Sequence, residues 1–283
     1  MLYLILAVFC NCLQAVAVRY SEKNLHNRFA VTMCNYFIAA LLCFLMLGSL
    51  TTADIKSGWQ LSIGLGFGNG VIFIMWLLLF QFSVSRNGAA LPVTFTKLGI
   101  LIPTLGSIIF FSEQPDLPHI VGIVLAPLAV VLFNLPRRGQ GGQKRISRFD
   151  PWLLLVLLAG GVGDFNMKIF ETFGDPGLDN FFLLIIFITA FLLSIGVWLA
   201  KGGGINRRDL LFGALIGIPN QLAAFFLLQS LMHLPAYVVF PVYSVGVILL
   251  ISMLGLLLFG ERLTRRQYLS MGLICLALIC LNI

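Results

Sequence analysis

Charged residues are scarce in this 283-residue sequence. Aspartate, glutamate, lysine and arginine together make up 10% of the chain, whereas hydrophobic residues make up 59%. A soluble domain carries about 25% charged residues, because its surface faces water. The composition therefore excludes an ordinary soluble domain and indicates a protein embedded in a lipid bilayer.

Groups that carry out catalysis or bind metals are also few. The three histidines, His26, His119 and His233, fall near the ends of apolar segments rather than together. No nucleophile stands beside a base. Cys10 and Cys12 face apart on a helix, and no cysteine lies near a histidine at the spacing of metal ligands. We therefore expect no enzyme, no catalytic residues, no cofactor and no metal site.

Long apolar runs are what the sequence has in abundance. A run of at least 18 apolar residues can cross the hydrocarbon core of a bilayer as a helix. Ten such windows cover nearly the whole chain and leave almost no residues for a soluble domain. We therefore predict an all-α polytopic membrane protein with ten transmembrane helices. The windows are 1–18, 29–48, 59–82, 88–111, 117–135, 151–172, 178–200, 208–232, 236–259 and 264–282.

The basic residues are distributed unevenly along the chain. Of the 18 lysines and arginines, Lys97 and Lys168 lie inside windows, and among the others only Lys56 follows an even-numbered window. Basic loops stay in the cytoplasm, so this asymmetry predicts that both termini lie outside. The net charge of +7 is then a topology signal and not a sign of a nucleic-acid partner. We expect a monomer or homodimer in the cytoplasmic (inner or plasma) membrane, with the lipid bilayer around it.

One long polar stretch divides the ten windows into five and five. We predict a first five-helix repeat at 1–135, a cytoplasmic linker at 136–150 and a second five-helix repeat at 151–283. An odd number of helices in each half makes the second half enter the membrane from the opposite side. The result is a pair of inverted repeats, an architecture found in many secondary transporters.

Markers at corresponding positions support the duplication. A constant spacing of 149 residues relates two glycines and one proline of the third and fourth windows to residues of the eighth and ninth. The fourth and ninth windows also end alike, in "FFSE" (Phe110 to Glu113) and "LFGE" (Leu258 to Glu261). The matched pairs are Gly64 with Gly213, Gly68 with Gly217 and Pro92 with Pro241.

These features resemble the drug/metabolite transporter superfamily and its ten-helix EamA-type members. The resemblance covers nearly the whole chain and rests on the 5+5 helices, the prolines and the closing "FGER" (Phe259 to Arg262), although Ser112 replaces the glycine of that marker in the first half. It implies a proton-coupled or facilitated carrier of small metabolites, with a cavity between the halves. Amino acids and amphipathic metabolites are the nearest analogy for its substrate.

The glycines of the third window do not form a phosphate-binding loop, because no strand precedes them and no Gly-Lys-Ser/Thr follows. Their spacing of four residues is that of close helix packing. We predict that Gly64, Gly68, Gly213 and Gly217 are packing positions, and Gly66 and Gly70 have the same spacing.

Polar side chains at membrane depth each need a partner or water. We assign the first, third, fourth, sixth, eighth and ninth windows to a substrate-binding cavity, with an interhelical hydrogen bond as the alternative role for each amide. The second, fifth, seventh and tenth windows are nearly bare and belong to the rim or a dimer contact. The candidates are Asn11, Gln14, Asn69, Asn166, Asn220, Gln221 and Tyr243.

Three charges lie inside the windows: Lys97, Asp164 and Lys168. Each costs about 2.5–3.5 kcal/mol when unpaired at the bilayer centre. Asp164 has Lys168 four residues along the helix as a ready partner, with Glu171 three residues further. That pairing leaves a surplus positive charge at Lys97.

Three roles are open for Lys97: a structural ion pair with Asp164, an anchor for an anionic substrate group, or proton exchange. Asp164, which would receive any ammonium group of such a substrate, and Lys168 are further candidates for coupling. We expect a secondary transporter of a small anionic or zwitterionic, amino-acid-like metabolite that works by alternating access. The alternative is a multidrug or organic-cation exporter in which Asp164 is the indispensable residue.

Overall fold

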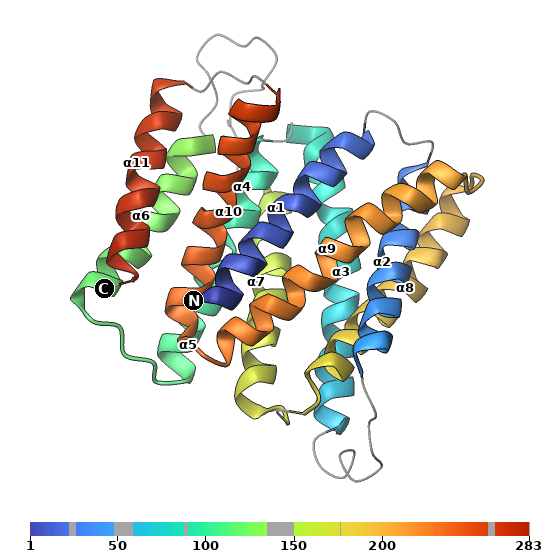
Figure 1. Cartoon of the computed structure of the whole chain (residues 1–283), viewed down its shortest axis with the longest axis horizontal. Helices are drawn as coiled ribbons and strands as arrows, with labels where there is room; N and C mark the ends of the chain where they lie inside the picture. The colour runs from blue at the N-terminus through green and yellow to red at the C-terminus, as the bar shows by residue number, and fades with distance from the viewer. Residues whose placement is uncertain are drawn as a thin grey trace. The chain divides into compact units, whose positions relative to one another are not determined.

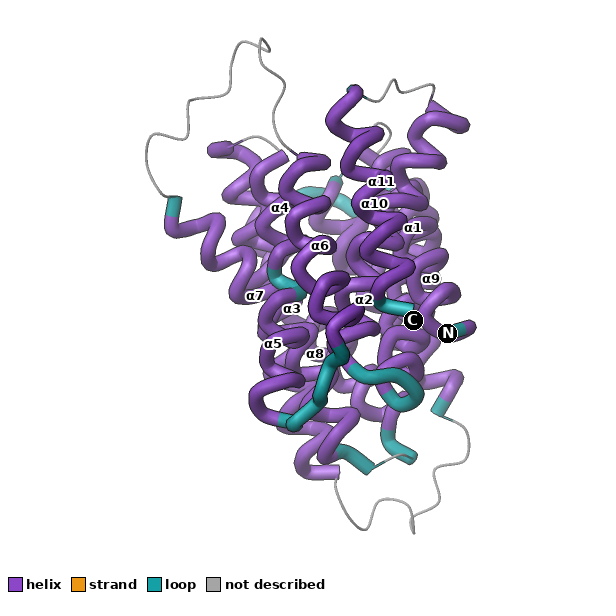
Figure 2. The backbone as a smooth tube through the Cα atoms, turned by 90° about the vertical axis from the view of Figure 1, so that its left-hand side faces the viewer, coloured by secondary structure: helices purple, strands orange, loops and turns teal. Residues whose placement is uncertain are grey.

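Every predicted apolar window folds as helix in the computed structural model (Figure 1). The structure describes residues 1–22, 27–47, 59–87, 90–134, 150–175, 177–259 and 264–282, and no strand occurs among them (Figure 2). The helices are α1 (Leu2–Glu22), α2 (Arg28–Met46), α3 (Trp59–Asn87), α4 (Ala90–Leu98), α5 (Leu101–Phe110), α6 (Leu117–Asn134), α7 (Pro151–Phe173), α8 (Asp179–Lys201), α9 (Arg207–Leu231), α10 (Ala236–Phe259) and α11 (Arg265–Cys280).

Nine spans within the described residues are long and apolar enough to cross a membrane. The fourth predicted window accounts for one of them, Leu91–Phe110, which comprises α4 and α5. The last window folds as α11, which has 16 residues and is shorter than a typical spanning helix. The chain thus has the helices of a multi-pass membrane protein.

The chain forms two compact units, which are described separately. Unit 1 comprises Met1–Ile74 and Asn166–His233, and unit 2 comprises Met75–Phe165 and Leu234–Ile283. Each unit therefore combines helices from both predicted repeats. The repeats are defined by sequence similarity, whereas the units are defined by contacts between residues. The units therefore do not test the predicted repeat boundaries at 135 and 151, which stay predictions. Residues 136–149 of the predicted linker lie outside the described residues.

In unit 1, α9 packs against α1 and α2, and α2 packs against α8 (Figure 1). Two aromatic contacts mark the ends of the α1–α9 crossing, with ring centroids 6.3 Å apart for Tyr3 and Phe226 and 6.2 Å apart for Tyr20 and Phe212. The second helix, predicted to belong to the rim, is therefore a central element of unit 1.

Close approach of helices in unit 1 occurs at glycines. A Cβ on Gly217 of α9 would lie 2.6 Å from the backbone oxygen of Asn35 on α2, and one on Gly70 of α3 would lie 2.7 Å from that of Ile186 on α8. Both distances are shorter than a van der Waals contact, so only glycine fits at these two positions. The predicted packing at Gly213 and Gly217 is confirmed.

The prediction for Gly64 and Gly68 is wrong. A Cβ at either position would meet nothing within 4 Å, whereas Cβ atoms at Gly66 and Gly70 would meet α8. The reason is helical phase: residues two apart point to different sides of a helix, so only one of the two glycine pairs in α3 can face α8.

The two glycine contacts share one pattern. Gly213 and Gly217 meet Cys34, Asn35 and Ile38 of α2, and Gly66 and Gly70 meet Ile185, Ile186 and Thr189 of α8. The glycines are related by 147 residues (213 − 66 and 217 − 70), and their partners by 151 (185 − 34, 186 − 35 and 189 − 38). The sequence spacing of 149 residues related the correct helices, α3 and α9. It matched Gly213 and Gly217 with Gly64 and Gly68, which lie two residues before the glycines that make the equivalent contact.

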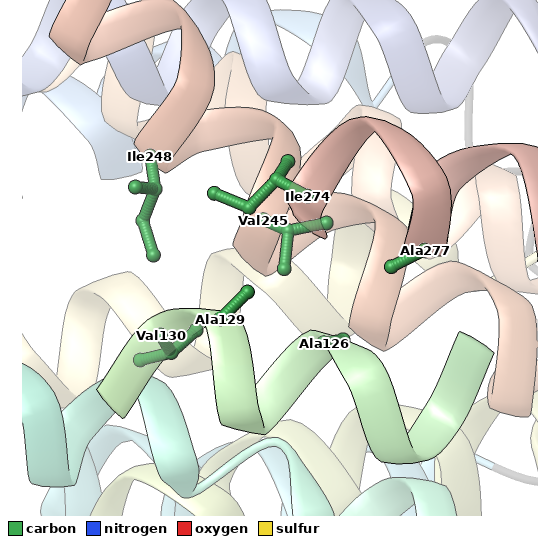
Figure 3. Packing of buried hydrophobic residues seen from close by; sticks show 7 residues of the cluster. All are labelled: Ala126, Ala129, Val130, Val245, Ile248, Ile274 and Ala277. Atoms are coloured by element: carbon green, nitrogen blue, oxygen red, sulfur yellow. The ribbon is translucent and has the colours of Figure 1, made fainter. Parts of the chain in front are cut away.

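In unit 2, the core lies between α6, α10 and α11. Small and β-branched side chains from the three helices interdigitate there (Figure 3). The Ser270 hydroxyl of α11 adds a hydrogen bond of 2.6 Å to the backbone oxygen of Ala129 on α6. The residues of this core are Ala126, Ala129, Val130, Val245, Ile248, Ile274 and Ala277.

Candidate functional site

The fourth span is broken near its middle. Helix α4 ends at Leu98 and α5 begins at Leu101. Pro103 has no N–H for the carbonyl of Gly99, four residues earlier, and its ring clashes with a regular helix there. That carbonyl instead accepts from the backbone N–H of Ile102 at 3.0 Å, which tightens the chain. The sequence predicted one continuous helix over 88–111, and the break is a correction.

The break places Lys97 in the last turn of α4. The C-terminus of a helix carries a partial negative charge, which favours a cation there. Broken helices inside a membrane are tolerated where protein or water satisfies the freed backbone groups. The lysine therefore lies next to irregular backbone.

Helix α7 contacts this break through glycine. A Cβ on Gly161 would lie 2.5 Å from the backbone oxygen of Gly99, and one on Gly99 would lie 2.9 Å from that of Leu157. With no side chain at either glycine, the two backbones touch. Asp164 follows Gly161 by three residues, and Lys97 precedes Gly99 by two, so the contact brings the charged positions together.

Lys97 and Asp164 attract each other electrostatically within unit 2. Both residues are half-buried. Burial costs each charge part of its hydration energy, and the opposite charge offsets some of that cost. Neither side chain makes a direct hydrogen bond or ion pair with a described residue of unit 2. The two groups form an opposite-charge pair that acts through space.

Lys168 has an ion-pair partner on its own helix within unit 1. In unit 1, the Lys168 ammonium donates to the Glu171 carboxylate at 2.6 Å. Glu171 is on the same helix face, and it lies three residues away from Lys168. With Glu171 counted against Lys168 and Asp164 against Lys97, these four groups carry no net charge, and the surplus positive charge that we inferred from the sequence disappears.

Other buried polar groups of unit 2 have no hydrogen-bond partner among the described residues. They are Nε1 of Trp76, Nδ1 of His119 and the hydroxyls of Ser83, Thr96, Thr104 and Ser244. The Trp76 nitrogen would lie 3.4 Å from a Cβ on Gly160, one turn before Asp164. Thr96 is adjacent to Lys97 in sequence. Of the predicted site residues, Tyr243 is half-buried on α10 in the same unit.

The amides of unit 1 find different partners. Nδ2 of Asn220 donates to Oδ1 of Asn35 at 3.2 Å, and Nε2 of Gln221 donates to the sulfur of Met46 at 3.4 Å. These are the interhelical hydrogen bonds that were the alternative to substrate binding. Asn69 is fully buried, and both of its amide atoms lack a partner among the described residues.

The remaining candidates, Asn11, Gln14 and Asn166, are half-buried in unit 1. Among the buried polar residues there that sequence reasoning missed are Asn35, Asp179 and Asn180, whose Oδ1 is buried. Asn35 is a single polar residue among apolar neighbours in the sequence, and Asp179 and Asn180 come just before the apolar run of α8. Hydropathy therefore did not indicate that these three residues are buried. Among the described residues, no group of three His, Cys, Asp or Glu side chains could hold a metal ion.

The "FFSE" marker has a structural role in unit 2. The Glu113 carboxylate accepts hydrogen bonds from the backbone N–H groups of Ala236 at 3.1 Å and Tyr237 at 3.2 Å. It thus caps the first turn of α10 and complements the positive end of that helix. The corresponding residues of the second marker, Glu261 and Arg262 of "FGER", lie outside the described residues.

Comparison with known proteins gives information on the fold. No protein-family model matches the chain. A Haemophilus influenzae protein described as uncharacterized is 25% identical over 290 residues, which cover 98% of this chain and 96% of that protein. A chain of known structure, described only as "Crystal structure of protein", aligns with a TM-score of 0.77 at 13% identity, over 99% of this chain and 94% of that chain. The chain therefore shares its fold with a protein of known structure.

Proposed function

We propose that this protein is a secondary transporter that moves a small zwitterionic or anionic metabolite, such as an amino acid, across the cytoplasmic membrane by alternating access. The observation that carries the proposal is the attraction between Lys97 and Asp164 beside the break between α4 and α5. Lys97 receives the carboxylate of the substrate, and Asp164 receives its ammonium group.

Charge balance favours a zwitterion. The charges of Lys97 and Asp164 cancel, so a substrate with one charge of each sign leaves the net charge unchanged. A purely cationic substrate would meet repulsion from Lys97, and a purely anionic one would meet repulsion from Asp164. The ion pair of Lys168 with Glu171 removes the surplus positive charge and so weakens the argument for a purely anionic substrate.

The break in the fourth span supports this assignment. Many secondary transporters bind substrates at discontinuous helices, where helix ends and freed backbone groups face polar ligands. Lys97 lies on the helical turn that ends at the break. The unpartnered polar groups of Trp76 and Thr96 add hydrogen-bonding capacity to the same segment of unit 2.

Alternating access follows from the proposed inverted repeat. The matched contacts of Gly213 and Gly217 with α2, and of Gly66 and Gly70 with α8, support a duplication. Two equivalent helix pairs can exchange roles as gates on opposite sides of the membrane. We assign the protein to the EamA-type drug/metabolite transporters on this basis, with both termini outside and transport that is proton-coupled or facilitated.

A thermal-shift screen of the purified protein tests the substrate class. The compounds are amino acids, organic anions, nucleosides, sugars and quaternary amines, each measured on the wild type, Lys97→Gln and Asp164→Asn. We expect stabilisation by zwitterionic amino acids that is lost in both variants. Uptake of the stabilising compound into proteoliposomes then establishes transport.

Two results would contradict the proposal. Stabilisation only by quaternary amines, lost in Asp164→Asn and kept in Lys97→Gln, would establish the cation exporter instead. Full transport activity in Lys97→Gln would remove Lys97 from the substrate site.

A further inference from the structure

Asp179 is a buried carboxylate at the first residue of α8 in unit 1. Only 9% of the residue is exposed. Its Oδ2 accepts a hydrogen bond of 3.0 Å from Nε2 of Gln229, near the end of α9. This bond joins the start of one helix to the end of the next.

The other oxygen of Asp179 is unsatisfied. Oδ1 is buried and has no hydrogen-bond partner among the described residues. An ionised carboxylate has about four acceptor sites to fill, and leaving a buried oxygen without a donor costs free energy. A proton on Oδ1 removes the charge and most of that cost.

The charged groups around Asp179 do not compensate its charge. Asp175, in the loop before α8, repels it electrostatically. On α7, Lys168 bonds to Glu171. At the end of α9, Nδ1 of His233 lies 2.8 Å from the backbone oxygen of Gln229. The segments of α2 and α3 that contact α8, Tyr36–Met46 and Gly66–Phe73, contain no charged residue.

We propose that Asp179 is a proton-binding site. While water reaches the carboxylate, Oδ1 takes a proton from a hydronium ion, so that an O–H bond of hydronium breaks as the O–H bond of the carboxyl group forms. The neutral carboxyl group is then buried as the contact with Gln229 closes, and it returns the proton to water when α8 and α9 separate. By the distribution of basic residues, the loop between α7 and α8 faces the outside, so the exchange takes place with the external solution.

The inferred role in coupling rests on the proposed transport function, whereas the proton binding does not. A proton that holds the α8–α9 contact closed makes opening toward the outside depend on external pH. Asp179 is then a coupling residue, and it is separate from the substrate site assigned to Lys97 and Asp164.

Infrared titration of the purified full-length protein tests the proton site directly. We expect a pH-dependent carboxyl C=O band that is lost in Asp179→Asn and retained in Asp164→Asn. Asp175→Asn removes the repulsion and should shift the titration to lower pH. Gln229→Met removes a donor to the ionised form and should shift it to higher pH, and this variant keeps the test valid if Asp179→Asn does not fold.

Two outcomes would overturn the proton site. One is a titration unchanged in Asp179→Asn, Asp175→Asn and Gln229→Met. The other is stabilisation by sodium, relative to choline at equal ionic strength, that is lost in Asp179→Asn, because a metal cation would then be the occupant.

A transport assay in proteoliposomes separates this inference from the proposed function. With a transported amino acid, Asp179→Asn should retain exchange at equal pH and lose the acceleration by an imposed pH gradient. Retained acceleration would overturn the coupling role. If the wild type transports no zwitterion, the proposed function fails, and the infrared titration still decides the proton site.

Discussion

Lys97 and Asp164 are 67 residues apart in sequence (164 − 97) and attract each other within unit 2. The backbone contact between Gly99 and Gly161 is what brings their helices together. The relationship explains why two charges persist in apolar spans. It also leads to a test of their interaction that does not depend on knowing the substrate.

A double-mutant cycle on Lys97 and Asp164 should give a coupling energy of roughly 0.5–3 kcal/mol. Lys97→Gln leaves an uncompensated carboxylate and Asp164→Asn leaves an uncompensated ammonium, whereas the double variant leaves no charge. We therefore expect the double variant to unfold at a higher temperature than the sum of the two single effects predicts. Thermal denaturation in detergent measures this, and strictly additive effects would show that the charges do not interact.

Glycines two residues apart in α3 should respond in opposite ways to alanine. Gly70→Ala places a Cβ 2.5 Å from that of Thr189 and should destabilise the protein by about 1–3 kcal/mol. Gly68→Ala meets nothing within 4 Å and should be neutral or stabilise by up to about 1 kcal/mol, because alanine favours helix. The melting temperatures of the two variants provide the comparison. A larger loss in Gly68→Ala would contradict the observed helical phase.

Acid should weaken the start of α7. Asp150 accepts hydrogen bonds from Nδ2 of Asn87 at 2.7 Å and from the backbone N–H of Trp152 at 3.1 Å. The Asn87 bond, with the Trp152 N–H and the nearby Arg86, lowers the pKa of the Asp150 carboxyl below its usual value. A lowered pKa in the folded state means stability that is present near neutral pH and is lost as pH falls through that pKa.

Asp150→Ala measures the stability that this cap contributes. At neutral pH we expect a loss of about 1 kcal/mol, typical of a helix N-cap. As pH falls through that lowered pKa, the wild type and the variant should converge, because the wild-type carboxyl is then protonated. Thermal melts at several pH values test this, with Asp116→Ala as an exposed control that should show no such convergence. A difference that is independent of pH would contradict the assigned role of the carboxylate.

The helices were predictable because apolar length is a local property. Each window of at least 18 apolar residues folds as helix, and the window 236–259 coincides with α10. The break in the fourth span was harder to predict from the sequence. Pro103 and Gly99 were visible in the sequence, yet proline also occurs inside the helices α6, α9 and α10 without ending them. Whether a proline ends a helix depends on what satisfies the freed carbonyl.

The site was predictable in its residues but not in its pairing. Lys97 and Asp164 were identified because charge is rare in apolar spans. Helix spacing offered Lys168 as a partner for Asp164, and the structure shows that Lys168 bonds to Glu171 and that Lys97 attracts Asp164. Spacing along one helix cannot reveal a partner on another helix. Asp179 was missed for a related reason, since its burial depends on Gln229, 50 residues away.

By itself, the sequence determined that the chain is a helical, multi-pass membrane protein, because a bilayer selects long apolar segments whatever their neighbours are. Only the tertiary structure decided which glycines touch, where the fourth span breaks and which charges face each other. Those features depend on the phase of each helix against its partner. A shift of two residues, as between Gly68 and Gly70, leaves the hydropathy of the span unchanged and turns a different side of the helix toward its neighbour.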